Sequence, residues 1–382
     1  MNEWKAEKPF EYLRRKENGE RFGTEIVKGW YIARAYVLRQ LTENQPCFTP
    51  NSNAHLQVVL DGDSAEMLFV ARQVALSAHY VNFDDEDEQR RHRTVISIVS
   101  HQPDIKAELE KEEYLCNLPK YAKFVDSEGV SEHFDSYLDI EIHILKEVPA
   151  ETGAHTLLFR QEEVAAFFEQ SQEDESVLGI DTRKAIYASR MYDIGVDIHN
   201  LPAEDIHCTK RYAKALDIFQ YEELEKPLQP MVVATQWERM SLSRIKENIS
   251  NILCADCFAL RRNSIAPCHH AKDKKGEREA MALWEAHNEA LSKSEHARWN
   301  VEKLVMGYRP FSEQERFEDN LLHVQKKGRK KAFRDGLKRN DADPAHIDIC
   351  SYRDLRRVNP DDLKYDSFLM LAIPKILAKI EN

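Results

Sequence analysis

Short apolar runs of strand type alternate with helical patterns between residues 56 and 192 of this chain. Parallel strands need long crossover connections, which helices usually supply, so this alternation is typical of a parallel sheet with helices packed on it. The pattern therefore predicts an α/β domain. The strand-like runs are residues 56–60, 94–99, 122–125, 138–145, 156–159 and 177–180, and the helical patterns are at about residues 65–80, 161–172 and 182–192.

A turn with a single glycine follows the first apolar run. It reads Asp61-Gly62-Asp63-Ser64 and leads into a helix, whose free backbone N–H groups would attract a phosphate. A dinucleotide-binding turn has three glycines, however, and two aspartates would repel a pyrophosphate. Gly62, Asp63 and Ser64 are the candidate cofactor-binding residues, with Ser64 as a helix cap and Asp63 as a contact to a ribose. A scaffold role for the domain is favoured over a bound nucleotide.

In its arrangement, the region of residues 56–219 resembles the Rossmann-like domain of bacterial potassium-uptake regulators. That domain is often joined to a ryanodine-receptor-type (RyR) domain in bacterial chains. The resemblance implies a domain that scaffolds or senses, and it leaves the identity of any nucleotide cofactor unknown.

Two changes in composition divide the chain of 382 residues, which is long enough for two or three domains with separate cores. A turn-rich run at residues 47–53 ends a helical N-terminal segment, and a run with two prolines at residues 222–230 has linker composition. We therefore expect an N-terminal helical segment at residues 1–50, a Rossmann-like α/β domain at residues 51–221 and a mainly helical domain at residues 231–382.

A helix with an aromatic and ionic face is predicted before a Gly-Tyr-Arg-Pro turn in the last of these domains. Glu295, Trp299 and Glu302 share one face at spacings of four and three. Arg298 and His296 lie within one turn of the tryptophan. An indole beside a guanidinium and an imidazole can stack a base and bind a phosphate, whereas the same groups facing a core would orient two packed helices. Both interpretations are open from these residues alone.

Three segments of the C-terminal part resemble the RyR domain family, which also occurs as repeats in ryanodine receptors. They are the helix and turn of residues 295–310, the segment 346–355 with the Tyr-Asp pair after it, and an upstream helix near Trp237. The resemblance covers residues 237–377. It implies a helical binding module with a small sheet-like element, nucleotide-type ligands and no catalytic residue. The candidate ligand-binding residues are Trp237, Arg244, Glu295, His296, Arg298, Trp299, Glu302, Tyr308 and Arg309.

Seven cysteines and no secretory signal predict reduced thiols and a cytoplasmic protein rather than a disulfide framework. Cys254 and Cys257, followed by Cys268 and His269, would supply enough soft ligands for a tetrahedral zinc ion. The chain has no second Cys-x-x-Cys pair, and cysteines three apart on a helix usually pack inward. Two buried thiols are therefore favoured over a metal site, and no metal is expected.

Charge and hydropathy argue against nucleic-acid and membrane partners. The formal net charge is −12, whereas phosphate backbones bind clustered Lys and Arg. The run at residues 326–339 has eight Lys or Arg among fourteen residues, but its single aromatic residue favours a solvated loop over a stacking platform. No apolar stretch reaches the roughly 18 residues of a membrane span. The aromatic and basic segment 26–41 would suit a membrane surface, yet a core-packed helix is favoured.

Catalytic motifs are missing from the sequence. It contains no Gly-x-Ser-x-Gly elbow, no His-Glu-x-x-His helix and no Walker-type phosphate loop. The acidic run at residues 84–88 is interpreted as a solvated turn. These observations favour a binding protein over an enzyme.

We expect the RyR-like domain to sense a small anionic ligand of nucleotide type. Trp299 would stack on the ligand, and Arg298 and Arg309 would bind its charge. His296 and Glu302 would set the polarity of the site. A scaffold that recruits a protein partner through the same helix face is the first alternative, and a nucleotide- or NAD-dependent enzyme is the second. A homo-oligomer is compatible with each of them.

Overall fold

The computed structural model describes most of the α/β region and the central helix of the C-terminal part. Several predicted features lie outside the described residues, namely the strand 177–180, the helix 182–192, the linker 222–230 and the residues Trp237 and Arg244. All but the last residue of the basic run also lie outside. The described residues are 24–44, 46–150, 155–172, 253–265, 279, 282–317, 339–340, 344–358, 362–363, 366–367, 369–370, 373 and 377.

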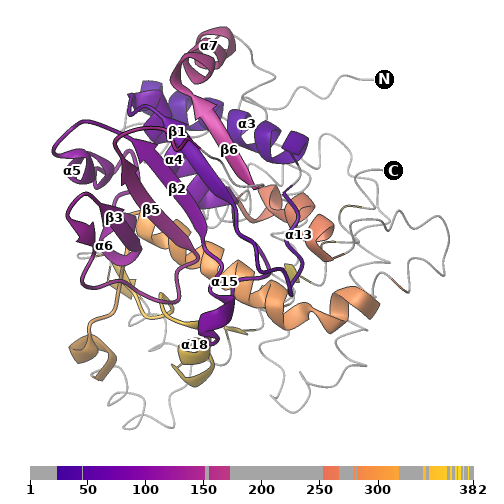
Figure 1. The fold of residues 1–382 in the computed structure, drawn as a ribbon. Coiled ribbons are helices and arrows are strands. Elements are labelled where there is room, and N and C mark those ends of the chain that lie inside the picture. The colour runs from indigo at the N-terminus through magenta and orange to yellow at the C-terminus, as the bar shows by residue number, and fades with distance from the viewer. Residues whose placement is uncertain are drawn as a thin grey trace.

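A six-stranded sheet forms the centre of the α/β region (Figure 1). Its strands are β1 (Gln57–Asp61), β2 (Thr94–Val99), β3 (Lys123–Asp126), β4 (Gly129–Val130), β5 (Ile140–Leu145) and β6 (Thr156–Arg160). Their order is β4-β3-β5-β2-β1-β6, and every pair is parallel except that of β3 with β4. The predicted α/β fold with a largely parallel sheet is therefore confirmed.

Helices accompany these strands and continue into the C-terminal part. They are α3 (Thr24–Asn44), α4 (Ala65–Ser77), the 3₁₀ helix η1 (Glu88–Arg90), α5 (Ile105–Leu109), α6 (Leu118–Tyr121), α7 (Gln161–Ser171), α13 (Phe258–Ile265), α15 (Asn288–Val305) and α18 (Tyr352–Val358). The predicted helices after the first and fifth apolar runs correspond to α4 and α7. The short elements β4, α5 and α6 were not predicted.

The strand order reverses at β1, which makes this strand the topological switch point of the sheet. The chain adds β2 on one side of β1, and β6 later pairs with the other side of β1. In open α/β sheets, such a reversal leaves a crevice outside the carboxyl ends of the two strands, where ligands commonly bind. The residues at these ends are Asp61 and Arg160, so the single-glycine turn after β1 lies at this position.

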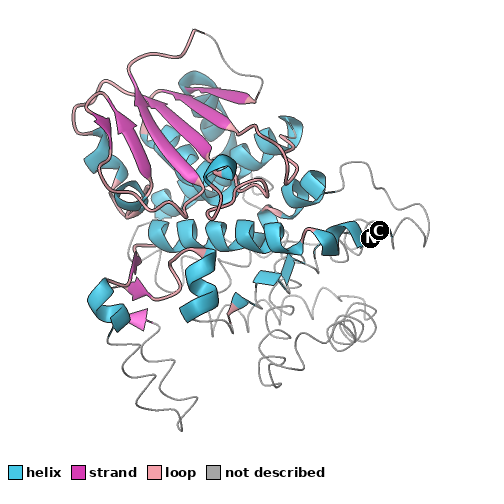
Figure 2. Cartoon of the chain, turned by 60° about the horizontal axis from the view of Figure 1, so that its bottom comes forward, coloured by secondary structure: helices cyan, strands magenta, loops and turns pink. Residues whose placement is uncertain are grey.

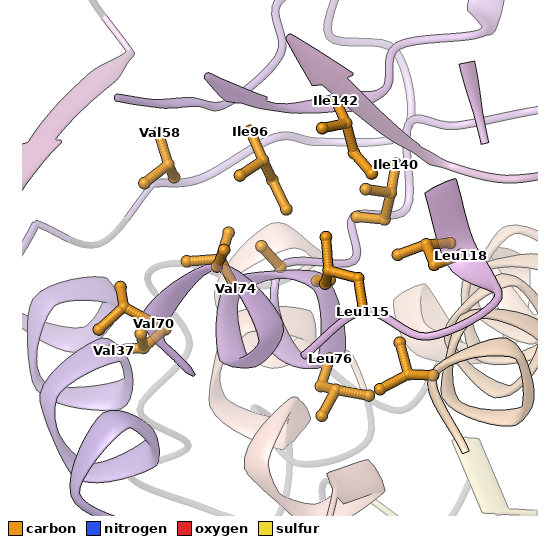
Figure 3. Packing of buried hydrophobic residues seen from close by; sticks show 14 of the residues in the cluster. Val37, Val58, Val70, Val74, Leu76, Ile96, Leu115, Leu118, Ile140 and Ile142 are labelled. Carbon is orange, nitrogen blue, oxygen red and sulfur yellow. The ribbon is translucent and has the colours of Figure 1, made fainter. Parts of the chain in front are cut away.

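Alternate residues of the strands pack against α4 (Figure 3). Val58 of β1 and Ile96 of β2 point toward Val74 of the helix, and Ile142 of β5 lies beside them. All four side chains are fully buried. Removal of a Val or Ile side chain from water contributes roughly 1.5–3 kcal/mol. This apolar layer therefore fixes the position of α4 on the sheet.

α3 packs on α4 in the same layer. Ile32, Val37 and Leu41 belong to the hydrophobic cluster of the sheet. A β-carbon at Gly29 would lie 2.6 Å from a ring atom of Phe69, so the glycine allows close contact between the two helices. Core packing of this segment is thus confirmed. In the part of the chain that the structure describes, no helix is both long and apolar enough to cross a bilayer.

α15 lies between the large sheet with its helices on one side and a small sheet with α18 on the other (Figure 2). The small sheet has the order β7-β9-β8, formed by β7 (Arg309–Pro310), β8 (Arg339–Asn340) and β9 (Ala345–His346). Val301 and Leu304 of α15 belong to the same hydrophobic cluster as the strands of the large sheet. The α/β region and α15 consequently share one core.

Candidate functional site

α15 carries most of the residues of the expected ligand site. Gly307 follows its end with a φ of +88°, a left-handed conformation that favours glycine. The N–H of Gly307 donates to the carbonyl of Leu304 at 3.0 Å, and the N–H of Tyr308 donates to that of Lys303 at 2.9 Å. The predicted end of the helix at Gly307 is confirmed.

A buried arginine joins two carboxylates of this helix. Arg298 donates from Nε and Nη2 to the two oxygens of Glu295, both at 2.9 Å, and from Nη1 to Glu302 at 2.7 Å. The exposed fractions are 1% for Arg298, 3% for Glu295 and 0% for Glu302. The guanidinium is therefore directed at protein carboxylates in the interior.

Arg261 of α13 and Lys303 extend this ionic network. Nη2 of Arg261 lies 2.8 Å from Glu295, and Nζ of Lys303 lies 2.7 Å from Glu302. Burial raises the pKa of both carboxyls, but the neighbouring cations outweigh it, so the pKa of Glu295 falls to about 2 and that of Glu302 falls below its ordinary value. Both carboxylates are charged at neutral pH, and their buried charge depends on the cations beside them.

His296 contacts the segment that follows the small sheet. Its Nε2 donates to the carbonyl oxygen of Cys350 at 3.0 Å, and its Nδ1 lies 3.4 Å from the carboxylate of Asp366. Burial lowers the pKa of the imidazole, but these acceptors raise it to about 10. His296 is therefore protonated at neutral pH, with Nε2 hydrogen-bonded to the carbonyl and Nδ1 ion-paired with the carboxylate. The same Cys350 carbonyl accepts from Nδ2 of Asn300 at 2.9 Å.

Trp299 is half-buried, unlike Arg298 and His296 beside it. Its ring is nearly parallel to the imidazole of His296, at 6.1 Å and 12°, and the ring of His346 meets it edge-on at 5.0 Å and 77°. Nζ of Lys303 lies 5.3 Å from the indole centroid. We call Trp299, His296, His346 and Lys303 the indole platform. It combines an aromatic surface with positive charge.

Tyr308 and Arg309 follow α15 in different environments. Tyr308 is buried, with its ring 6.5 Å from that of His346. Arg309 is half-buried and pairs through Nη1 and Nη2 with the two oxygens of Glu315 at 2.8 and 2.9 Å. These hydrogen bonds lower the pKa of Glu315 to about 2. The guanidinium of Arg309 thus has a protein carboxylate as a partner.

A side chain of the protein occupies the space beside the turn after β1. Gly62 has a φ of +136°, and a β-carbon there would lie 2.1 Å from Oε1 of Gln161, the first residue of α7. Arg160, the preceding residue, lies with Nη1 3.8 Å from the carboxylate of Asp61. A pyrophosphate that approached the backbone of Gly62 would have to displace Gln161.

Asp63 and Ser64 also have partners within the protein. The hydroxyl of Ser100, which follows β2, donates to the carboxylate of Asp63. Ser64 stands at the N-cap position of α4, but its hydroxyl donates to Glu66 at 2.8 Å and makes no cap hydrogen bond. The expectation that the Ser64 side chain caps the helix is therefore wrong, because the carboxylate of Glu66 competes for the hydroxyl.

Cys254 and Cys257 are two buried thiols next to the ionic network, as expected for an inward-facing pair. Burial raises the pKa of both, that of Cys257 to about 12. Both thiols are therefore protonated at neutral pH. Within the described residues, no three His, Cys, Asp or Glu side chains could hold a metal ion, and Cys268 and His269 lie outside those residues.

Four residues contact the site but were not among the candidate ligand-binding residues: Arg261, Lys303, His346 and Asp366. Lys303 lies four residues after Trp299, a spacing that could have indicated its place beside the ring. Arg261 and Asp366 come from distant segments. No local pattern links them to α15, so only the fold reveals them.

No protein-family model, curated protein or solved structure matches the chain. The resemblances to RyR domains and to potassium-uptake regulators therefore stay predictions. Function is inferred from the fold and from the geometry of the site.

Proposed function

We propose that the C-terminal part of the chain is an RyR-like helical module that senses a small anionic ligand of nucleotide type and catalyses no reaction. The half-buried indole of Trp299, with the ammonium of Lys303 beside it, carries this proposal. An aromatic face can stack a base, and an ammonium can bind a phosphate oxygen. Lys303 donates to Glu302, and an ammonium has three donors, so it can bind a ligand as well.

The buried ions support this role by holding the indole in place. Arg298 and His296 direct their donors to carboxylates and a carbonyl of the protein, so we assign them the positioning of Trp299 rather than contact with the ligand. This revises the hypothesis in which Arg298 binds the ligand charge. Arg309 is the more accessible guanidinium, and a ligand phosphate would compete with Glu315 for it.

Calorimetric titration of the full chain with AMP, GMP, their cyclic forms and the parent nucleosides tests the proposal. Trp299→Ala should weaken nucleotide binding at least about fivefold, since stacking contributes roughly 1–3 kcal/mol per base. Lys303→Met should weaken the binding of nucleotides and leave the affinity for nucleosides unchanged. Lys111→Met is the matched control, because this lysine is exposed and paired with Glu108. Absence of binding by the wild type, or equal affinity in all variants, would contradict the proposal.

A scaffold that recruits a partner chain is the second candidate. The burial of Arg298 and His296 favours it, because these groups then serve only to hold elements of the fold together. A partner would cover the same half-buried indole. Native mass spectrometry of the purified protein distinguishes the two candidates. A co-purified nucleotide supports the sensor, and nucleotide-free protein with a co-eluting chain supports the scaffold.

A further inference from the structure

A lysine of α15 reaches back to the acidic run before β2. Nζ of Lys293 lies 2.7 Å from the carboxylate of Asp84 and 2.7 Å from that of Glu86, although about two hundred residues separate these positions. The lysine side chain is only 8% exposed. The interpretation of the acidic run as a solvated turn is therefore wrong for Asp84, whose side chain is 15% exposed, whereas Glu86 is exposed, as that interpretation expects. Both carboxylates pair with a largely buried ammonium that would otherwise be uncompensated.

The same run contacts α18. The carboxylate of Asp85 accepts from the backbone N–H of Tyr352, the first residue of that helix, at 3.2 Å. Arg356, one turn later in α18, pairs with Glu289 of α15 and lies 5.0 Å from the ring of Tyr352. The acidic run, α15 and α18 therefore meet at one place.

The acidic run is itself fixed to the large sheet. The N–H of Asp84 donates to the carbonyl of Arg90 at 2.9 Å, and Phe83 forms an antiparallel bridge with Arg91. Three residues after Arg91, the chain enters β2, a central strand. Movement of this part of the sheet would consequently move the carboxylates that hold Lys293.

The elements held by the acidic run carry part of the indole platform. Lys293 lies three residues before His296 on α15. The ring of Tyr352 meets that imidazole edge-on at 5.8 Å and 62°, and the carbonyl of Cys350 accepts its Nε2 hydrogen. His296 in turn lies against Trp299. Contacts between neighbouring groups thus connect the acidic run to the indole.

We propose that Asp84, Asp85, Glu86 and Lys293 form an acidic clasp that fixes α15 and α18 to the large sheet and transmits changes in the sheet to the indole platform. The clasp itself requires no ligand. Its regulatory role rests on the proposed function, because that function defines what the platform binds. The contacts above form a continuous path of packed and hydrogen-bonded groups, along which coupling between the sheet and the platform would be carried.

Hydrogen–deuterium exchange of the full chain, without ligand, tests the clasp. Lys293→Met and the double variant Asp84→Asn/Glu86→Gln should each make the amides of residues 288–300 and 352–358 exchange about tenfold faster, because α15 loses an anchor and α18 is paired with α15 through Arg356 and Glu289. The amides of β2 should keep their rate. Glu88→Gln is the control, since this carboxylate belongs to the same run but is 86% exposed.

Combination of the two changes distinguishes a clasp from general destabilisation. Once the lysine is removed, neutralising Asp84 and Glu86 should cause little further acceleration, since among the described residues the only other ion pair that this breaks is the 3.6 Å one of Asp84 with Arg90, within the run itself. In Lys293→Arg, which keeps the charge, the same amides should exchange at the wild-type rate. Unchanged exchange in the variants, effects that add, or acceleration confined to residues 352–358 would overturn the proposal. These outcomes do not depend on nucleotide binding, so the exchange experiment still tests the clasp if the sensor proposal fails.

Discussion

The side-chain oxygen of Gln161 lies 2.1 Å from the position that a β-carbon at Gly62 would occupy. The parallel pairing of β6 with β1 brings the two residues together, because α7 begins at the residue directly after β6. The short connection leaves no loop that could move aside. The position at the carboxyl ends of β1 and β6, where open α/β sheets commonly bind ligands, is therefore occupied at this point by a side chain of the protein itself.

Gly62→Ala should destabilise the fold more than Gly129→Ala. Both glycines have a positive φ, which costs an alanine on the order of 1–2 kcal/mol. A β-carbon at position 129 meets no atom within 4 Å, whereas the contact with Gln161 should add about 1 kcal/mol. Urea unfolding measures the difference between the two variants, and adding Gln161→Ala to Gly62→Ala should remove the part of the cost that comes from this contact. Equal losses at the two glycines would contradict the contact.

The strands could be predicted because they are short apolar runs bounded by turns. Thr94–Val99 is a run of this type, interrupted only by Ser97, and the structure has a strand with the same bounds. β4 has two residues and α6 has four, which is too short for any periodicity to appear. The sharing of one core by α15 and the sheet was also not predicted, because it depends on contacts such as those of Val301 that leave no local pattern.

Arg298→Met should destabilise the protein by about 3–5 kcal/mol, because it leaves two buried carboxylates without their common cation. Arg357→Met is the control. The side chain of Arg357 is 80% exposed and pairs with Asp354 within α18, so its loss should change the unfolding free energy by less than about 0.5 kcal/mol. Urea unfolding at pH 7 measures both variants. A loss at Arg298 no larger than that at Arg357 would be inconsistent with a buried ionic network.

The spacing of α15 predicted one face shared by Glu295, Trp299 and Glu302 and left open whether that face is buried. Positions three before and four after an arginine also face it on any helix, and the structure pairs Arg298 with both carboxylates. Such a charged helix is ordinarily read as exposed. Its burial follows from Arg261 and Asp366, which lie far away in the sequence and satisfy the charges only after folding.

Stability should decrease as the pH rises from about 6.5 to about 10 because of His296. The pKa of its imidazole is about 10 in the folded protein, against an ordinary value of 6.5, so the folded state keeps a proton that the unfolded chain releases. The stabilisation is complete below pH 6.5 and is lost as the pH rises through 10. The difference in unfolding free energy between the wild type and His296→Gln should therefore shrink by up to about 1.4 kcal/mol per pH unit in this window. A difference that is independent of pH would exclude the buried imidazolium.

Arg72 of α4 connects the layer on the sheet to the end of α15. Its guanidinium lies 4.4 Å from the ring centroid of Trp30, and Nη1 donates to the carbonyl of Tyr114 at 2.6 Å and to that of Val305 at 3.4 Å. Val305 ends α15, where carbonyls have no partner within the helix and a cation is favourable. Burial lowers the pKa of Arg72 to about 10, so the side chain is still charged at neutral pH.

Arg72→Met should cost about 1–3 kcal/mol, because the carbonyls of Tyr114 and Val305 lose their donor while the apolar stem is kept. Arg39→Met is the matched control. Arg39 also stacks on a ring, 4.7 Å from the centroid of Phe167, but its side chain is half exposed, so its loss should cost no more than about 1 kcal/mol. Urea unfolding compares the two variants. Equal losses of unfolding free energy in the two variants would mean that stacking on a ring alone accounts for the stabilising effect of Arg72. A larger loss at Arg72 would mean that the end of α15, two residues after Lys303 of the indole platform, depends on a cation supplied by the α/β region.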